Sequence, residues 1–191
     1  HGTKHSFPTR RSSDLMRAFA LSLVAAFVAT GAVAKEIPLG APKTEGGMNI
    51  AAVYLQPIEM EPEGMMRPAK ESDVHMEADI KAAKGNTNGF AEGDWIPYLV
   101  VNYELTREGG PTQKGEFMPM VANDGPHYGD NVKLSGPGKY KLKLVIQPPS
   151  ANKHAHFGRH VDKETGVGEW FKPITVEFEF PFAGTGKKGA Y

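Results

Sequence analysis

Alternation of apolar and polar side chains is the feature that most limits how this chain can fold. It is clearest near the C-terminus, where the apolar residues are Ile174, Val176, Phe178, Phe180 and Phe182. Successive side chains of a β-strand point to opposite faces, so the pattern predicts a strand with one buried face. Composition and alternation predict further strands at 48–55, 74–81, 95–106, 115–122 and 140–146, with a short one at 131–134.

Glycine- and proline-rich segments separate these strands, and residues 35–191 have no sustained helical periodicity. Several strands joined by such turns are typical of an antiparallel sandwich. We therefore expect an all-β protein with an immunoglobulin-like antiparallel β-sandwich. A closed barrel remains the alternative, since alternation alone does not separate the two.

The N-terminus predicts processing rather than folded structure. Residues 1–15 resemble a translated cloning adaptor, and we expect them to be extraneous. Residues 16–34 follow as a signal peptide, with Arg17, an apolar run and an A-x-A cleavage site that ends at Ala34. The apolar run is shorter than a bilayer span. We therefore expect residues 35–191 to form a single β-sandwich metal-binding domain in the periplasm, not embedded in the membrane.

Charge and cysteine content exclude several partners and ligands. Residues 1–34 carry four of the 22 basic and one of the 22 acidic residues, so 35–191 is slightly acidic. Such a charge gives no case for binding nucleic acid, which requires neutralised phosphates. Because the chain has no cysteine, any metal must be held by histidine, methionine or carboxylate.

Residues 117–131 place a thioether and an imidazole close together, at Met120 and His127. This soft and borderline pair suits copper better than calcium or magnesium. His75 and Glu77 share the polar face of their predicted strand, so we expect both outside the core. Since histidine has an ordinary pKa of about 6.5, copper affinity is expected to fall between about pH 7 and 5.

Two groups of residues leave the ligand set open. Met118 shares a strand face with Met120 and is an alternative thioether donor. The loop at 59–68 carries Met60, Met65 and Met66 among acidic residues. It resembles an exported copper-binding methionine cluster, although scattered methionines in an acidic loop are also compatible with no function.

No catalytic signature stands out. The sequence lacks a G-x-S-x-G elbow, an H-E-x-x-H pair and a phosphate-binding glycine loop before a helix. We therefore expect a binding protein, not an enzyme.

Three separated motifs resemble those of a bacterial periplasmic iron-transport family. They are His-Met-Glu-Ala-Asp-Ile from residue 75, Met-Pro-Met-Val-Ala-Asn-Asp-Gly-Pro-His-Tyr-Gly-Asp-Asn from residue 118, and Phe-Gly-Arg-His-Val-Asp-Lys-Glu-Thr-Gly-Val-Gly from residue 157. The founding members are nineteen-kilodalton iron-regulated proteins that are partners of an inner-membrane iron permease. The resemblance covers nearly all of residues 35–181.

The resemblance implies a homodimeric immunoglobulin-like sandwich that binds copper, with an iron site nearby, and assists iron uptake. By motif, the copper ligands would be His75, Met120, His127 and His160, with Glu77 as a weaker or alternative ligand. His154 and His156 form an insertion beside the last motif and are alternatives to His160.

Two other functions remain open at this point. One is a periplasmic copper chaperone or resistance protein with the same site. The other is a structural or ligand-binding β-sandwich in which the histidines have no metal function.

Overall fold

The computed structural model describes Gly2 and residues 35–186, and these are organised as an antiparallel β-structure. Apart from Gly2, the expected extraneous segment 1–15 and signal peptide 16–34 lie outside the described residues. The strands are β1 Ile37–Pro38, β2 Lys43–Glu45, β3 Met48–Leu55, β4 Val74–Ala82, β5 Val100–Arg107, β6 Thr112–Ala122, β7 Gly125–Val132, β8 Gly138–Gln147 and β9 Ile174–Phe182. Two 3₁₀ turns, Ala69–Glu71 and Pro149–Ala151, are the only helical segments in the described part of the chain.

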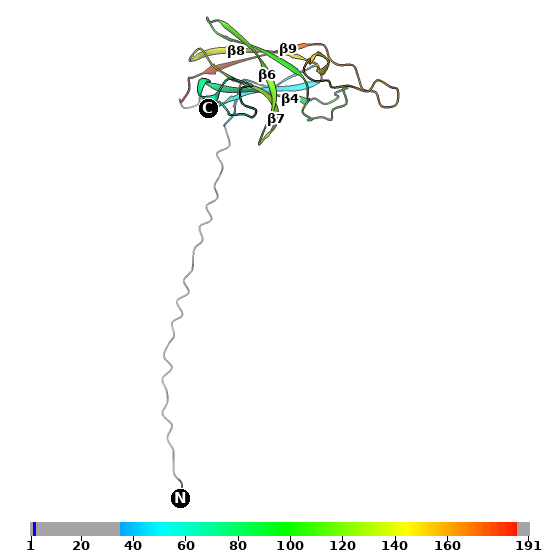
Figure 1. Cartoon of the computed structure of the whole chain (residues 1–191), viewed down its shortest axis with the longest axis horizontal. Helices are drawn as coiled ribbons and strands as arrows, with labels where there is room; N and C mark the ends of the chain where they lie inside the picture. Colours follow the sequence, from blue (N-terminus) through cyan, green and yellow to red (C-terminus); the bar gives the residue numbers. More distant parts are fainter. Residues whose placement is uncertain (1, 3–34, 187–191) are drawn as a thin grey trace. The chain divides into compact units, whose positions relative to one another are not determined.

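The strands follow one hydrogen-bonded path in the order β1-β3-β4-β7-β6-β5-β8-β9, and β2 pairs with β3 outside that path. Figure 1 shows β8 and β9 in one layer and β4 and β7 in the other. The all-β antiparallel prediction is confirmed, and the curled two-layered sheet is consistent with the immunoglobulin-like type. Within residues 35–186 the path runs from an edge at β1 to an edge at β9, which is the arrangement of a sandwich rather than of a closed barrel.

Strand β6 belongs to both layers. Its first half pairs with β5, from Thr112 to Phe117, and its second half pairs with β7, from Met118 to Ala122. A strand that bends across in this way forms a corner of a sandwich.

One core lies between the layers. Strand β9 buries Val176, Phe178, Phe180 and Phe182 and exposes the residues between them, as the alternation predicts. Strands β5 and β8 contribute Leu105, Leu142, Leu144 and Ile146 in the same way.

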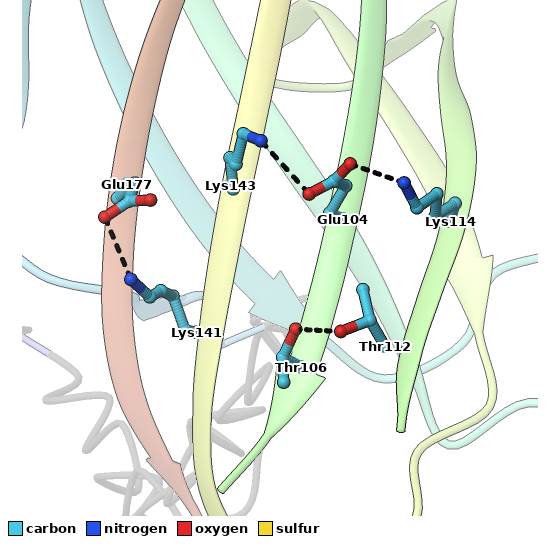
Figure 2. A network of polar contacts seen from close by, with 7 residues as sticks. All are labelled: Glu104, Thr106, Thr112, Lys114, Lys141, Lys143 and Glu177. Atoms are coloured by element: carbon cyan, nitrogen blue, oxygen red, sulfur yellow. Dashed lines mark hydrogen bonds and ion pairs between the residues drawn. The ribbon is translucent and has the colours of Figure 1, made fainter. Parts of the chain in front are cut away.

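The outer face of the β9-β8-β5-β6 layer is polar. Figure 2 shows Glu104 between Lys143 and Lys114, with N–O distances of 3.1 and 2.7 Å, and Lys141 paired with Glu177 at 3.1 Å. Exposed ion pairs of this kind contribute little stability, since water screens them. Their role is to keep this face soluble while the opposite face is buried.

Two strands begin furthest from the positions that the sequence predicted. Strand β5 begins at Val100 because Pro97 lacks an amide hydrogen and Tyr98 has a φ of 62°, which strand geometry does not allow. Strand β7 covers Gly125–Val132, whereas only residues 131–134 were expected. A two-residue turn at Asn123 and Asp124 joins it to β6 as a hairpin.

No helix in the described part of the chain is long and apolar enough to cross a bilayer.

Candidate metal centre

Strand β4 brings His75 and Glu77 to the face of the sheet that is turned away from the core. Side chains two residues apart share a face, and Val74 and Met76 fill the opposite one. Both polar side chains are nevertheless buried, with exposed fractions of 0% for His75 and 5% for Glu77. The expectation that they share the polar face outside the hydrophobic core is confirmed, but that face is covered here instead of open to solvent. This part of the outer face is covered, because backbone groups of the loop after β3 contact the Asn131 side chain beside His75.

Strand β7 lies next to β4 and supplies the second imidazole. His127 is 4% exposed, and Met120 of β6 is its direct cross-strand partner. Residues that face each other in an antiparallel pair point to the same side of the sheet. Met120 therefore lies on the face that carries His127, as the spacing in the sequence suggested.

The donor atoms of His75, Glu77 and His127 all lie within 4.8 Å of one another. Oε1 of Glu77 is 3.5 Å from Nε2 of His75 and 3.4 Å from Nε2 of His127, and neither nitrogen has a hydrogen-bond partner. In the described part of the chain, only one other buried side-chain nitrogen or oxygen, Nε1 of Trp95, lacks a partner. Because an unpaired buried polar atom costs about 1–3 kcal/mol, two of them aimed at one carboxylate indicate a site for a cation.

Asn131 fixes which nitrogen of His75 faces the centre. Its side-chain nitrogen donates to the carbonyl oxygens of Ile58, at 2.8 Å, and Arg67, at 2.9 Å, so its oxygen must be the acceptor. That oxygen accepts from the backbone N–H of Ile58 and lies 3.0 Å from Nδ1 of His75. Nδ1 therefore carries the hydrogen, and Nε2 presents its lone pair to Glu77 and His127.

Gly129 makes room for the His75 ring. It is the cross-strand partner of Glu77 in β4 and of Met118 in β6, so it lies at the middle of the site. A Cβ atom at this position would lie 2.7 Å from Nε2 of His75 and 2.9 Å from the carbonyl oxygen of Met76. Any other residue would displace the imidazole.

Burial sets the protonation of the three donors. Burial lowers the pKa of His75 to about 4, against the opposing effect of the Asn131 hydrogen bond, and burial also lowers the pKa of His127. Burial raises the pKa of Glu77 to about 8, and the charges of Glu36, Asp124 and Asp79 add to that rise. Near pH 7 both imidazoles are therefore neutral and able to bind metal, and the carboxyl carries the proton that a cation would displace.

His160 is not among the donors that the structure brings together. Its side chain is 74% exposed, and its Nδ1 lies 2.7 Å from Oγ1 of Thr165 within the same loop. His154 and His156 are also exposed. Phe157 anchors this loop by stacking on Phe90 and Tyr98, with ring centroids 6.3 and 4.9 Å away, and by contacting Trp170.

Two supporting residues of β7, Gly129 and Asn131, were not among the candidates predicted from the sequence. Gly129 and Asn131 lie two and four residues beyond His127, so the period of a strand places all three on one face. That signal was available in the sequence, but the stretch was interpreted as a turn followed by a shorter strand.

Known proteins resemble the whole described domain. The family model described as Fe2+ transport protein matches residues 33–184. A UPF0423 protein of Brucella abortus strain 2308 is 76% identical over 182 residues, which are 95% of this chain and 97% of the relative. The 34 kDa membrane antigen of Treponema pallidum strain Nichols is 41% identical over 150 residues, covering 75% and 72% of the two chains.

Two solved structures have the same fold at high identity. FetP of uropathogenic Escherichia coli strain F11, as isolated, aligns with a TM-score of 0.74 and 54% identity over 78% of this chain and 97% of that one. Copper-reconstituted P19 of Campylobacter jejuni aligns with a TM-score of 0.76 and 51% identity over 80% and 99%.

Proposed function

The chain belongs to the Fe2+ transport protein family, and on that premise we propose that it is a periplasmic protein that binds copper and iron and assists high-affinity iron uptake through an inner-membrane permease. Removal of residues 16–34 would release residues 35–191 into the periplasm. The protein acts by binding metal, without turnover of a substrate.

The observation that carries this proposal is the convergence of two buried, unpaired imidazole nitrogens on Glu77. Two imidazoles and the thioether of Met120 form a donor set that accommodates both oxidation states of copper. Copper-bound structures of FetP and P19, the relatives with this fold, support the same choice of metal.

Iron would be favoured on the carboxylate side of the centre. Burial raises the pKa of Glu77, and the charges of Glu36, Asp124 and Asp79 add to that rise. Iron prefers oxygen donors more than copper does, and these carboxylates supply them. We propose that iron is the transported ion and that copper is the resident one.

We further propose that His160 completes the copper site from a second copy of the chain. The three buried donors leave the coordination of copper incomplete, whereas His160 is exposed on an anchored loop and is separate from the donors of its own chain. A homodimer in which each loop reaches the other protomer would bring the expected four ligands together.

Metal analysis of untagged, dialysed protein tests the binding role. After loading with Cu(II), we expect about one Cu(II) ion per chain in the wild type, its loss in the His75→Ala and His127→Ala variants, and its retention in the His156→Ala control. Protein that folds but retains no metal would favour a structural sandwich instead.

Transport distinguishes iron uptake from copper resistance. A host that lacks its own iron uptake systems should grow in low iron when it expresses the chain together with the cognate permease, and the His127→Ala variant should not support that growth. Rescue of copper tolerance without any gain in iron uptake would identify a copper chaperone.

The thioether has its own test. Replacing Met120 by Leu keeps the volume and removes the soft donor, so Cu(I) affinity should fall by about tenfold or more while Cu(II) affinity changes less. Equal losses for both oxidation states in a competition titration would contradict a ligand role for Met120.

A further inference from the structure

We propose that the protein has a second metal site, selective for Cu(I), in a cavity lined by Met65, Met66, Met118 and His154. The cavity has a volume of about 1080 Å³. Three segments far apart in the sequence contribute these donors: the loop after β3, strand β6 and the loop after β8. The site uses none of the donors of the buried centre and does not depend on the function proposed for that centre.

The methionines of this cavity are not packed as core residues are. Met48 and Met76 have exposed fractions of 0%, and each fills a gap in the core, as methionine commonly does. Met65 has an exposed fraction of 59%, and Met66 and Met118 are only partly buried. Burial of apolar surface therefore does not account for the presence of these thioethers in the cavity lining.

The loop that bears Met65 and Met66 is held in place on both sides of them. Asn131 exchanges two hydrogen bonds with the backbone of Ile58 and donates a third to the carbonyl oxygen of Arg67. The Ser72 hydroxyl donates to the carbonyl oxygen of Pro68, which fixes the end of the loop. A fixed backbone presents the two thioethers to the cavity at a lower entropic cost than a free loop would.

The charges around the cavity favour a monovalent soft ion. Lys114 pairs with Glu104 at 2.7 Å, and Lys133 pairs with Asp73 at 2.9 Å. Asp130 accepts a hydrogen bond from the Tyr103 hydroxyl, and Arg67 and Glu116 are the other charged residues of the lining. Positive and negative groups thus nearly balance, and the neutral donors are sulfur and imidazole. Cu(I) binds such donors readily, whereas iron and other hard ions require more carboxylate.

Strand β6 links the cavity to the buried centre. Met118 and Met120 are two residues apart and share a face, so they are about 7 Å apart along the strand. Met120 faces His127 across the hairpin. If Met118 binds Cu(I) in the cavity, that thioether lies one strand repeat from the thioether of the centre.

Ag(I), which is soft, monovalent and inert to redox change, provides a residue-resolved test. Protein labelled at methionine methyl carbons would be titrated with Ag(I) and followed by NMR. We expect the Met65, Met66 and Met118 methyl signals to shift together, while Met60 and Met76 stay unchanged. Met60 is a matched control because it is on the same loop but does not line this cavity. Shifts confined to Met120 would overturn the proposal.

Variants separate this site from the buried centre. The double variant Met65→Leu with Met66→Leu should weaken Cu(I) binding at one of two sites by at least about tenfold and leave Cu(II) binding unchanged. The control variant Met60→Leu should change neither Cu(I) nor Cu(II) binding. His75→Ala should abolish Cu(II) binding while the Ag(I) shifts at Met65 and Met66 persist. Loss of those shifts in His75→Ala, or a single Cu(I) equivalent in the wild type, would contradict a second site.

Discussion

Asn131 connects the orientation of the His75 imidazole, a proposed metal ligand, to the position of a loop. Its side chain is 2% exposed and contacts His75 on one side and the backbone of Ile58 and Arg67 on the other. Residues that orient a metal ligand through its second ring nitrogen commonly change metal affinity by 10–100-fold when they are replaced. At the scale of single residues, Asn131 is thus expected to affect metal affinity without being a ligand itself.

Replacing Asn131 by Ala should lower copper affinity by at least about tenfold, because the His75 ring loses the acceptor that holds its Nε2 toward the centre. It should also destabilise the fold by about 2 kcal/mol or more, since buried backbone groups lose their partners. Copper titration and chemical denaturation measure the two effects. Asn152→Ala is the control, because the Asn152 side chain makes exposed hydrogen bonds to the backbone of Tyr98 and His154. Unchanged copper affinity would show that packing alone orients His75.

Glu77 should govern the pH dependence of copper binding. With the pKa of His75 lowered to about 4 and that of Glu77 raised to about 8, the proton that competes with metal near neutrality is on the carboxyl group. Copper affinity should therefore rise from pH 6 to about pH 8 and then level off. Ordinary histidines would instead place the change in affinity lower, between about pH 5 and 7. Glu77→Gln should remove this dependence. If the slope persists in that variant, another group carries the proton.

Strands β6 and β7 and the loop after β8 contribute to the site in different ways. The tight hairpin at Asn123 and Asp124 sets the register that places Met120 opposite His127. The loop of residues 148–173 is instead held by its own aromatic contacts at Phe157. The first element builds the buried centre, and the second presents His160 away from it.

His160→Ala should lower copper affinity by at least about tenfold, or about 1.4 kcal/mol, if a second copy of the chain supplies this ligand. Changing His154 and His156 together should cost less Cu(II) affinity, since neither lies inside the matching motif. The mass of the protein in solution, measured with and without copper, should show that His160→Ala weakens a metal-dependent dimer. Loss of Cu(II) binding only in the double variant would assign the ligand to the inserted residues.

At the largest scale, residues 35–186 form a sandwich with a polar site in the outer face of one layer. The core between the layers supplies the stability, and the site opposes it by burying two imidazoles and a carboxyl group. The balance between these effects depends on pH, because the unfolded chain titrates with ordinary pKa values.

The metal-free protein should lose stability between about pH 6.5 and 8. In this range folded Glu77 keeps its proton, because its pKa is about 8, whereas unfolded Glu77 has already lost it. The folded state thus binds more protons, and stability falls as pH rises, by about 2 kcal/mol over the window. Below pH 6.5 the opposite shift of His75, toward about 4, offsets the slope. Thermal unfolding of the Glu77→Gln variant should lack the fall above pH 6.5, and an identical fall there would exclude Glu77 as its origin.

The sequence by itself determined the strands and most of the candidate donors. Alternation is a local property, so the exposed and buried residues of β9 follow from the order of residues in that segment alone. The pairing of Met120 with His127 is equally local, because a hairpin joins neighbouring residues. The family motifs also lie within the chain and need no folded context.

Only the tertiary structure decided which donors meet and how they titrate. His75 reaches His127 because β4 pairs with β7, about fifty residues further along the chain, and period-two spacing contains no information about which strands become neighbours. Burial on the outer face was likewise invisible, since it depends on contacts with a loop that Asn131 holds. That burial raises the pKa of Glu77 above its usual value and lowers the pKa of His75 below its usual value. Both shifts result from desolvation, which no sequence pattern predicts.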